Sequence, residues 1–395
     1  MTRRVLHVLE ATIGGTKRHL LDLAVGLRAA GWDVEVACPR VRDENHGDVS
    51  FWDDLARLGV TAHEVPMRRR PLNGENALAL PRLVQLIRHG QYDVVHAQSS
   101  IAGALARPAA RTAGLLSGRQ PKVVYSPHGF AFLSEEWGRR RNAFLAAERA
   151  LGTLTDRLIA VSPTESEQAI GAGIVPRRTV AVVPNGVVSS ASPALRRQIG
   201  DVVPELAAWN GAPLVGTIAR MLAQKDPLTW VRVAARVAEQ RPDARFLWIW
   251  GGDMEAEVRL EVERLGLTGR IQFLGHRADA REILTSLDVF LLTSLFEGLP
   301  YSPIEALACE TPVVATDVAG TRDVVTHGEN GLLAPAGDVN GLAACVVQLL
   351  QESETARRLG RRGREDALER FSVERMVAGT SRVYQELLHV PQPAR

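Results

Sequence analysis

The chain has 395 residues, the length of two ordinary domains. Hydrophobic residues make up 46% and charged residues 23%, a composition typical of globular proteins, which excludes a disordered or fibrous protein. The formal net charge of +2 gives no reason to expect a nucleic-acid partner. Cys38, Cys309 and Cys345 lie far apart, which excludes a disulfide scaffold or a cysteine-rich zinc site and suits a reducing cytoplasm.

Residues 1–190 alternate short apolar runs with amphipathic stretches, the pattern of parallel β/α units. The apolar run after Arg4 is too short for a signal peptide and contains His7, so it is expected to be a buried first strand. No 18 apolar residues follow one another, so no membrane-spanning segment is expected. Helical spacing of apolar residues predicts a helix over residues 17–30. Strands are expected at residues 4–9, 33–38, 93–96, 122–126, 157–161 and 179–183.

Residues 191–372 repeat this alternation, which predicts a second doubly wound, Rossmann-like α/β domain after a Pro-, Ser- and Gly-rich join within residues 187–213. The terminal segment 373–395 begins with an amphipathic helix, expected over residues 373–388. Strands are expected at residues 214–218, 245–250, 270–274, 288–292 and 312–315. Helices are expected near residues 227–240, 254–265, 278–286, 301–309, 338–351 and 354–369.

In doubly wound folds, ligands bind at the carboxyl ends of the strands, so the loops that follow the strands are where chemistry is expected. After the first strand come Gly14 and Gly15, directly before a helix. Paired glycines let the backbone approach a ligand closely, and a helix N-terminus favours an anion. The loop is not a GxGxxG motif, so a dinucleotide site is not favoured, and a plain tight turn explains the glycines equally well.

A histidine, His128, follows the strand 122–126 and precedes Gly129. This position at the carboxyl end of a strand is suited to a side chain that faces a cleft. A histidine with a purely structural role is the alternative.

Two cations mark the start of the second half of the chain. Arg220 follows the strand 214–218, and Lys225 lies just before Pro227, which is expected to begin a helix. A guanidinium and an ammonium at such a junction could hold a diphosphate. Lysine is rare in this chain, but solvated surface charges are the alternative interpretation.

The densest signal is a pair of carboxylates, Glu297 and Glu305, which stand on either side of a turn and the start of the helix 301–309. Backbone N–H groups at a helix start can bind phosphate oxygens. A carboxylate about one helical turn later can accept from ribose hydroxyls. The alternatives are that Glu297 caps the helix and that Glu305 complements the helix dipole.

Taken together, these features resemble the retaining glycosyltransferases of family 4. The segment 297–305 matches the E-x7-E motif of that family, and Arg220 with Lys225, the Gly14 loop and His128 support the match over essentially the whole length. The resemblance implies the GT-B architecture, in which two Rossmann-like domains face each other across a donor cleft. Residues 1–190 would bind the acceptor, residues 191–372 the nucleotide sugar, and the segment 373–395 would cross back to the first domain.

The resemblance also implies roles for single residues. Arg220 and Lys225 would hold the diphosphate and stabilise the leaving group, Glu297 would contact the transferred sugar, and His128 would lie near that sugar at the reaction centre. Glu305 would bind the ribose. The implied substrate-binding residues are Gly14, Gly15, Gly251, Leu274, Gly298, Leu299, Pro300, Tyr301, Ser302 and Glu305.

Two departures from the family pattern stand out. The usual Gly-Asp-Gly after the strand 245–250 appears here as Gly251-Gly252-Asp253, which puts contacts near the base in doubt, and Cys309 is followed by Glu310 in place of glycine. No DxD motif is present, so no metal and no other cofactor is expected. Retention in the family is attributed to substitution on one face of the sugar, without the carboxylate pair of hydrolases.

The resemblance implies a UDP-sugar donor and a lipid-linked saccharide acceptor in polysaccharide biosynthesis, with the protein in the cytoplasm and in peripheral contact with the inner face of the membrane. Basic stretches at residues 67–71 and 139–145 could contact anionic lipid headgroups, although solvated helix faces explain them equally well. A transferase for a soluble small molecule or natural product is the main alternative. A GT-B-fold UDP-N-acetylglucosamine epimerase would need further acid/base carboxylates, and a non-catalytic sugar-nucleotide-binding protein would not need this set of residues.

Overall fold

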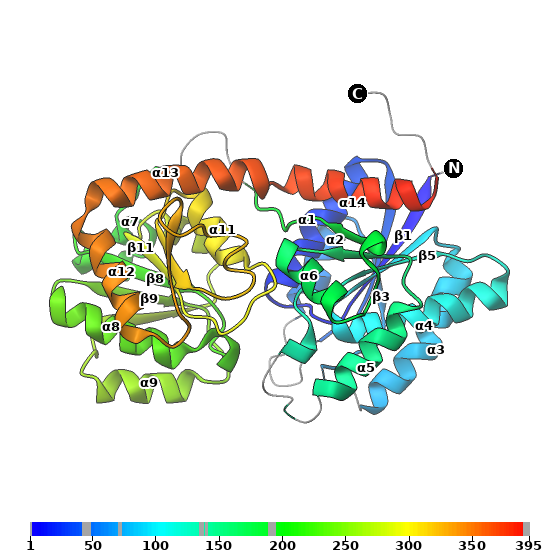
Figure 1. Ribbon diagram of the computed structural model, residues 1–395, viewed down its shortest axis with the longest axis horizontal. Helices are drawn as coiled ribbons and strands as arrows, with labels where there is room; N and C mark the ends of the chain where they lie inside the picture. Colours follow the sequence, from blue (N-terminus) through cyan, green and yellow to red (C-terminus); the bar gives the residue numbers. More distant parts are fainter. Residues whose placement is uncertain are drawn as a thin grey trace. The chain divides into compact units, whose positions relative to one another are not determined.

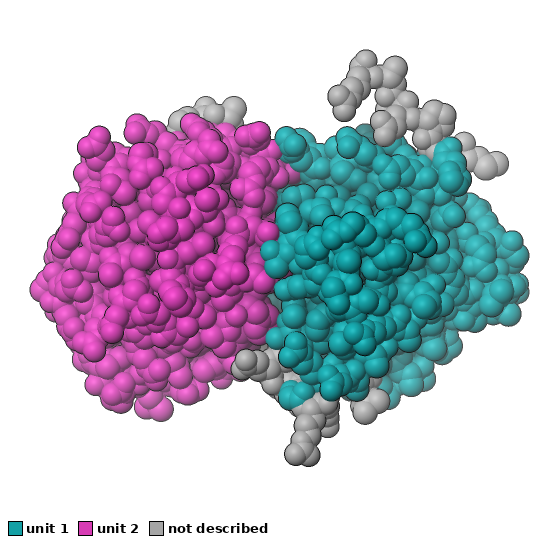
Figure 2. All heavy atoms as spheres, in the orientation of Figure 1, with its two compact units in different colours: residues 1–186, 373–395 teal, residues 187–372 magenta. Residues whose placement is uncertain are grey.

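The computed structural model describes residues 2–41, 49–69, 73–133, 138, 141–188 and 195–389. The chain divides into two compact units, shown in separate colours in Figure 2. Unit 1 contains residues 1–186 and 373–395, and unit 2 contains residues 187–372. The division falls between Gly186 and Val187, slightly before the boundary expected at residue 190.

Among its described residues, unit 1 is built on a seven-stranded parallel sheet in the order β3-β2-β1-β4-β5-β6-β7. The six expected strands form within two residues of their predicted bounds, whereas β3 was not predicted. The strands are β1 Arg3–Leu9, β2 Trp32–Cys38, β3 Thr61–Glu64, β4 Val94–Gln98, β5 Lys122–Ser126, β6 Arg157–Ala160 and β7 Val180–Val182.

Both faces of this sheet are covered by helices, as expected for parallel strands (Figure 1). On one face Leu6 and Val8 of β1 pack with the alanines of α4, and on the other face Val5 and Leu9 pack with α1. The helices of unit 1 are α1 Gly15–Ala29, α2 Ser50–Arg57, α3 Gly74–Gly90, α4 Ser100–Ser117, α5 Arg141–Gly152, α6 Pro163–Gly171 and α14 Val373–Leu387, with short 3-10 turns at Ala131–Leu133 and Arg177–Thr179.

The terminal helix α14 lies beside α1 (Figure 1) and belongs to unit 1. Its apolar face completes the core on that side of the sheet, because Met376 and Tyr384 are buried there. Two side-chain hydrogen bonds fix it: Trp32 Nε1 donates to Ser381 Oγ at 3.0 Å, and the Tyr384 hydroxyl lies 2.6 Å from His96 Nδ1.

Unit 2 is built on a six-stranded parallel sheet in the order β10-β9-β8-β11-β12-β13. The strands are β8 Leu214–Ile218, β9 Arg245–Ile249, β10 Ile271–Gly275, β11 Val289–Leu292, β12 Val313–Thr316 and β13 Gly331–Ala334, of which β13 was not predicted. The helices are α7 Ile199–Val202, α8 Pro227–Gln240, α9 Glu255–Arg264, α10 Ala280–Leu284, α11 Tyr301–Ala308, α12 Val339–Gln351 and α13 Ser353–Arg370, with 3-10 turns at Pro204–Trp209 and Ala223–Lys225. Among the described residues, no helix combines the length and apolar character needed to cross a bilayer.

Candidate functional site

In unit 2, the loops after the neighbouring strands β8 and β11 are joined by hydrogen bonds. The Thr293 hydroxyl donates to the carbonyl oxygens of Lys225 and Asp226, at 2.9 and 3.0 Å, and the Leu295 N–H donates to the Gln224 carbonyl at 2.8 Å. Asp226 begins α8 by accepting from the Thr229 N–H. The loop that carries Lys225 is therefore fixed against the loop that leads to Glu297.

This arrangement brings together Lys225 and Glu297, which lie 72 residues apart in the sequence and form an ion pair. The Glu297 carboxylate also accepts from the Ser294 hydroxyl at 2.6 Å, and Gln224 Nε2 donates to the Phe296 carbonyl at 3.0 Å. Glu297 is 8% exposed, and these partners satisfy its buried carboxylate. The surface-charge interpretation of Lys225 is therefore wrong.

The helix that follows, α11, starts at Tyr301, with Pro300 at its N-cap and no side chain capping it. The interpretation of Glu297 as a helix cap is therefore wrong. The first N–H groups of α11 have no partner within the helix, as at any helix start, and no acidic residue lies in its first turn. Within the predicted set 298–302, Leu299, Pro300 and Ser302 are buried, whereas Gly298 and Tyr301 are half-buried. Glu305 is half-buried in the second turn.

A glycine from another loop supports the backbone at Glu297. Gly320 has a φ of +83°, and a Cβ atom there would lie 2.7 Å from the carbonyl oxygens of both Glu297 and Gly298. Only glycine suits this backbone conformation in so narrow a space. The loop after β12 therefore touches the main chain of the E-x7-E segment directly.

The remaining predicted residues of unit 2 lie after β8, β9 and β10. Arg220 is half-buried two residues beyond the end of β8 and interacts with its surroundings. The Met221 N–H donates to the Gly251 carbonyl at 3.0 Å, which ties the loop after β8 to the loop after β9. Leu274 lies within β10 and is half-buried. Arg220, Gly251 and Leu274 thus lie in or after three adjacent strands, toward their carboxyl ends.

The expected strand 245–250 ends one residue early, because Trp250 adopts a left-handed φ of +98°. Its indole meets the His276 ring edge-to-face, with 4.5 Å between ring centroids. Backbone strain in a bulky residue is found where the surrounding structure imposes it, often at binding sites. The sequence signal for this feature was an aromatic residue at the carboxyl end of a strand, which belongs to none of the motifs named above.

In unit 1, His128 lies two residues beyond β5 and has a φ of +54°. Its Nε2 lies 2.6 Å from Oε1 of Gln98, the last residue of β4. The adjacent Gly129 N–H donates to the Glu165 carboxylate at 2.6 Å, and the same carboxylate accepts from the Val161 N–H at 2.8 Å. Gln98 and Glu165 are both 1% exposed, and neither was predicted from the sequence.

His128 belongs to a group of four histidines at this edge of the sheet. Its ring meets that of His19 from α1, with 4.5 Å between centroids, and the rings of His7 and His96 lie 5.1 Å apart. Burial lowers the pKa of His7 to about 3 and that of His19 to about 4. Burial and neighbouring histidines hold the pKa of His96 and of His128 well below the usual value, so all four rings are neutral at pH 7.

The paired glycines of unit 1 lie at the start of α1. Gly14 is half-buried with a φ of +80°, and Gly15 is exposed as the first residue of the helix. The Thr16 hydroxyl donates to the Ala11 carbonyl at 2.8 Å, which closes this turn. The positive φ accounts for Gly14 without a ligand, so both interpretations of the loop stay open.

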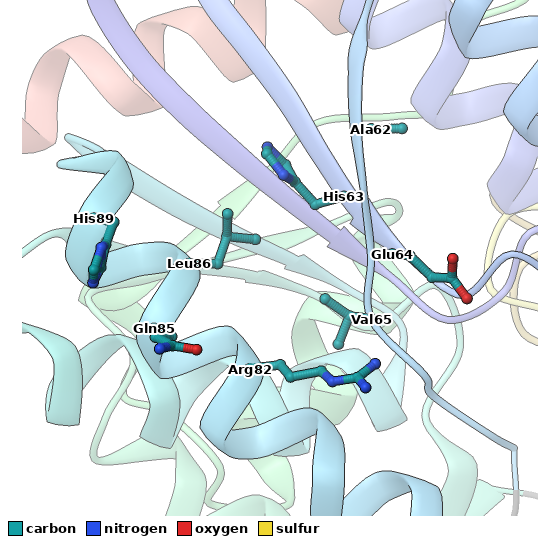
Figure 3. A pocket seen from close by; sticks show the side chains of 8 residues that line it. All are labelled: Ala62, His63, Glu64, Val65, Arg82, Gln85, Leu86 and His89. Atoms are coloured by element: carbon teal, nitrogen blue, oxygen red, sulfur yellow. The ribbon is translucent and has the colours of Figure 1, made fainter.

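Other features of unit 1 lie outside this group of residues. A shallow pocket of about 500 Å³ between β3 and α3 is lined by none of the predicted site residues (Figure 3).

In the basic stretch 67–71, Arg68 pairs with Glu75 at 2.6 Å. Arg70, Arg139 and Arg140 lie outside the described residues, and Arg141 begins α5. Within the described ranges, no group of three His, Cys, Asp or Glu side chains is arranged to hold a metal ion.

Comparisons with known proteins identify both halves of the chain. The family model "Glycosyltransferase Family 4" matches residues 13–190, and the model "Glycosyl transferases group 1" matches residues 212–352. A 2-deoxystreptamine glucosyltransferase of Streptomyces kanamyceticus is 30% identical over 381 residues, which cover 89% of this chain and 92% of that protein. The UDP-Gal:alpha-D-GlcNAc-diphosphoundecaprenol alpha-1,3-galactosyltransferase of Escherichia coli is 28% identical over 88% of each chain.

Solved structures agree on the fold. HepE of Anabaena, crystallised with UDP and glucose, superposes with a TM-score of 0.81 at 22% identity, over 97% of this chain and 100% of that chain. Sucrose-phosphate synthase of Thermosynechococcus elongatus superposes with a TM-score of 0.80 at 22% identity, over 98% and 99% of the two chains. With both halves matched by models of one enzyme class and a 30% identical relative aligned over nearly its whole length, the chain belongs to glycosyltransferase family 4 and is a glycosyltransferase of the GT-B fold.

Proposed function

We propose that this glycosyltransferase moves a sugar from a UDP-sugar to a lipid-linked saccharide, with retention of configuration and without a metal ion. The observation that carries the proposal is the Lys225–Glu297 ion pair at the carboxyl ends of β8 and β11. It places an ammonium and a carboxylate together near the start of α11. A nucleotide diphosphate needs a cationic partner such as the ammonium, whereas the hydroxyls of its sugar need an acceptor such as the carboxylate.

The charges of the reaction suit this pair. Breaking the bond between the anomeric carbon and the diphosphate builds negative charge on the departing phosphate. Lys225 and Arg220 stabilise that charge, and the N–H groups of the first turn of α11 bind phosphate oxygens. Before the donor binds, Glu297 neutralises the Lys225 ammonium. Once the diphosphate shares that ammonium, the carboxylate can accept from sugar hydroxyls, while Glu305 accepts from the ribose.

The donor proposal is supported by the UDP in the HepE crystal structure and by the UDP-galactose in the name of the Escherichia coli relative. We expect UDP-sugars to raise the melting temperature of the protein more than GDP- or ADP-sugars do, because a ligand that binds only the folded state stabilises it. Differential scanning fluorimetry across the three donor classes measures this. Equal shifts for all three would contradict a UDP preference, and conversion of the sugar to its epimer without UDP release would replace transfer by isomerisation.

The acceptor proposal rests on the same Escherichia coli relative, whose name gives an undecaprenol diphosphate acceptor. Such an acceptor is held in a membrane, so the enzyme would bind the membrane surface reversibly through basic side chains. We expect UDP release to be faster with a polyprenyl-diphosphate-linked saccharide in anionic liposomes than with soluble saccharides, and to slow at high salt. The Streptomyces relative supports the alternative of a soluble aminocyclitol acceptor, which faster turnover of 2-deoxystreptamine would establish.

Metal independence and retention are tested together. Because Arg220, Lys225 and backbone N–H groups supply the positive charge for the leaving diphosphate, we expect excess EDTA to leave the transfer rate unchanged. The new glycosidic bond, analysed by NMR, should keep the anomeric configuration of the donor. A rate that requires added Mg²⁺ or Mn²⁺ would overturn metal independence, and an inverted product would overturn retention.

A further inference from the structure

One buried amide in unit 1 links two histidines. Gln98 is 1% exposed at the end of β4. Its Oε1 lies 2.6 Å from His128 Nε2, and its Nε2 lies 3.1 Å from His7 Nδ1. No motif in the sequence pointed to Gln98, and the transfer mechanism above does not use it.

The two ends of an amide have opposite roles, so this chain of hydrogen bonds has a direction. The carbonyl oxygen of Gln98 can only accept, so His128 Nε2 carries its proton. The amide nitrogen can only donate, so Nδ1 of His7 is an unprotonated acceptor. A neutral imidazole carries one N–H, which places the remaining lone pair of His128 on Nδ1 and the proton of His7 on Nε2.

The far end of this hydrogen-bond chain is Nε2 of His7. His7 is fully buried, and its Nε2 has no hydrogen-bond partner among the described residues. A buried, unpaired donor is costly, and such groups persist where a neighbouring arrangement requires them. The Nε2–H of His7 is therefore a cost of this arrangement, whose direction follows from the two ends of the Gln98 amide.

The position of the ring is also fixed through the main chain. Glu165 accepts from the N–H of Gly129, the residue after His128, and so holds the loop in its left-handed conformation. The titratable rings around His128 are His19 from α1 and, beyond Gln98, His7 of β1 and His96 of β4. All three are neutral at pH 7, so none of them supplies a charge that would favour an imidazolium at His128.

We propose that Gln98 is a positioning residue for His128, which it holds as the neutral tautomer protonated at Nε2, so that Nδ1 is offered as an acceptor to a substrate hydroxyl. The inference rests on the proposed transfer reaction, and on the place near the transferred sugar that the family resemblance implies for His128. A residue that only packed against His128 would need the right size. The positioning role also requires that the carbonyl oxygen of Gln98, and not its amide nitrogen, faces the ring.

The first test uses the unmodified protein. In ¹⁵N-edited NMR of the imidazole rings, with His128 assigned by comparison with His128→Asn, we expect Nε2 to be protonated and Nδ1 unprotonated from pH 6 to pH 8. A protonated Nδ1 in this range would overturn the proposal. This measurement needs neither substrate nor a variant at Gln98.

The second test replaces the neutral amide of Gln98, whose nitrogen donates to His7, by a negatively charged carboxylate. Gln98→Glu keeps the size of the side chain but places a carboxylate beside His128, and an anion raises the pKa of a neighbouring imidazole. We expect Nδ1 to be protonated at pH 7, kcat to fall about 10-fold or more, and activity to return as the pH rises above the raised pKa. Gln98→Met removes both hydrogen bonds, so kcat should fall at all pH values.

Tyr384→Phe is the matched control, because it removes a buried hydroxyl that bonds His96 in the same strand while leaving Gln98 intact. We expect it to lower stability without changing the His128 nitrogen shifts or the pH profile. UDP affinity should be unchanged in every variant, since the residues proposed to bind UDP lie in unit 2. A wild-type pH profile in Gln98→Glu would overturn the proposal, whereas failure of the wild-type protein to bind UDP would overturn the proposed function instead.

Discussion

Replacing Lys225 by alanine is expected to lower kcat/KM for sugar transfer about 100-fold or more, the size of loss seen when a group aimed at developing negative charge is removed. The variant also leaves the Glu297 carboxylate, 8% exposed, without its ion-pair partner. UDP affinity should fall as well, because an uncompensated carboxylate repels the diphosphate. Steady-state kinetics and calorimetric titration with UDP measure the two effects, and Arg220→Ala is expected to show a kinetic loss of similar size.

Two further variants separate charge from stability. Lys225→Ala combined with Glu297→Gln removes the unpaired carboxylate, so the melting temperature should recover while kcat/KM stays low. Lys122→Ala removes a half-buried lysine at the amino end of β5, away from the carboxyl edge of its sheet, and should leave turnover unchanged. Near-normal turnover of Lys225→Ala would show that the ion pair is structural and that the diphosphate is held elsewhere.

Gly320→Ala is expected to abolish UDP binding and lower turnover at least 100-fold, although Gly320 carries no functional group. The added methyl group would lie 2.7 Å from the carbonyl oxygens of Glu297 and Gly298, so the main chain of the E-x7-E segment must move. The first turn of α11 would then lose its alignment with the ion pair. Calorimetric titration with UDP and thermal unfolding measure the effect.

The matched control is Gly328→Ala. Gly328 has a φ of +81°, close to the +83° of Gly320, but a Cβ atom there meets nothing within 4 Å. Both variants pay the same conformational strain of a left-handed residue, so only the collision with the Glu297 backbone distinguishes them. Equal losses of UDP affinity in the two variants would assign the effect to strain alone.

Most of the fold was predictable because buried parallel strands read as continuous apolar runs. β3 was missed because it lies at the edge of its sheet and none of its four residues is fully buried, so its sequence Thr61–Glu64 is largely polar. β13 is also an edge strand, and its four residues begin with a glycine that must pack against Val313 and Val325. Short edge strands carry little periodicity for a sequence pattern to reveal.

The candidate site, like the fold, was predictable only in part. Motif residues such as Glu297 and Lys225 could be named from the sequence, but their pairing could not, because it depends on how the loops after β8 and β11 meet. Ser294 and Gln98 belong to no motif. The one available signal for Gln98 was a polar residue directly after an apolar run, at the carboxyl end of a strand whose predicted bounds stopped at residue 96.

The course of the chain has a consequence for protein synthesis. Unit 1 takes its last helix from residues 373–387, so a ribosome must finish all of unit 2 before the core around Met376 and Tyr384 can close. Until then the nascent N-terminal sheet exposes the apolar face that α14 later covers, a surface on which chaperones act. Because Tyr384 bonds His96, two residues from Gln98, the histidine edge of the sheet is also among the last parts of the enzyme to be completed.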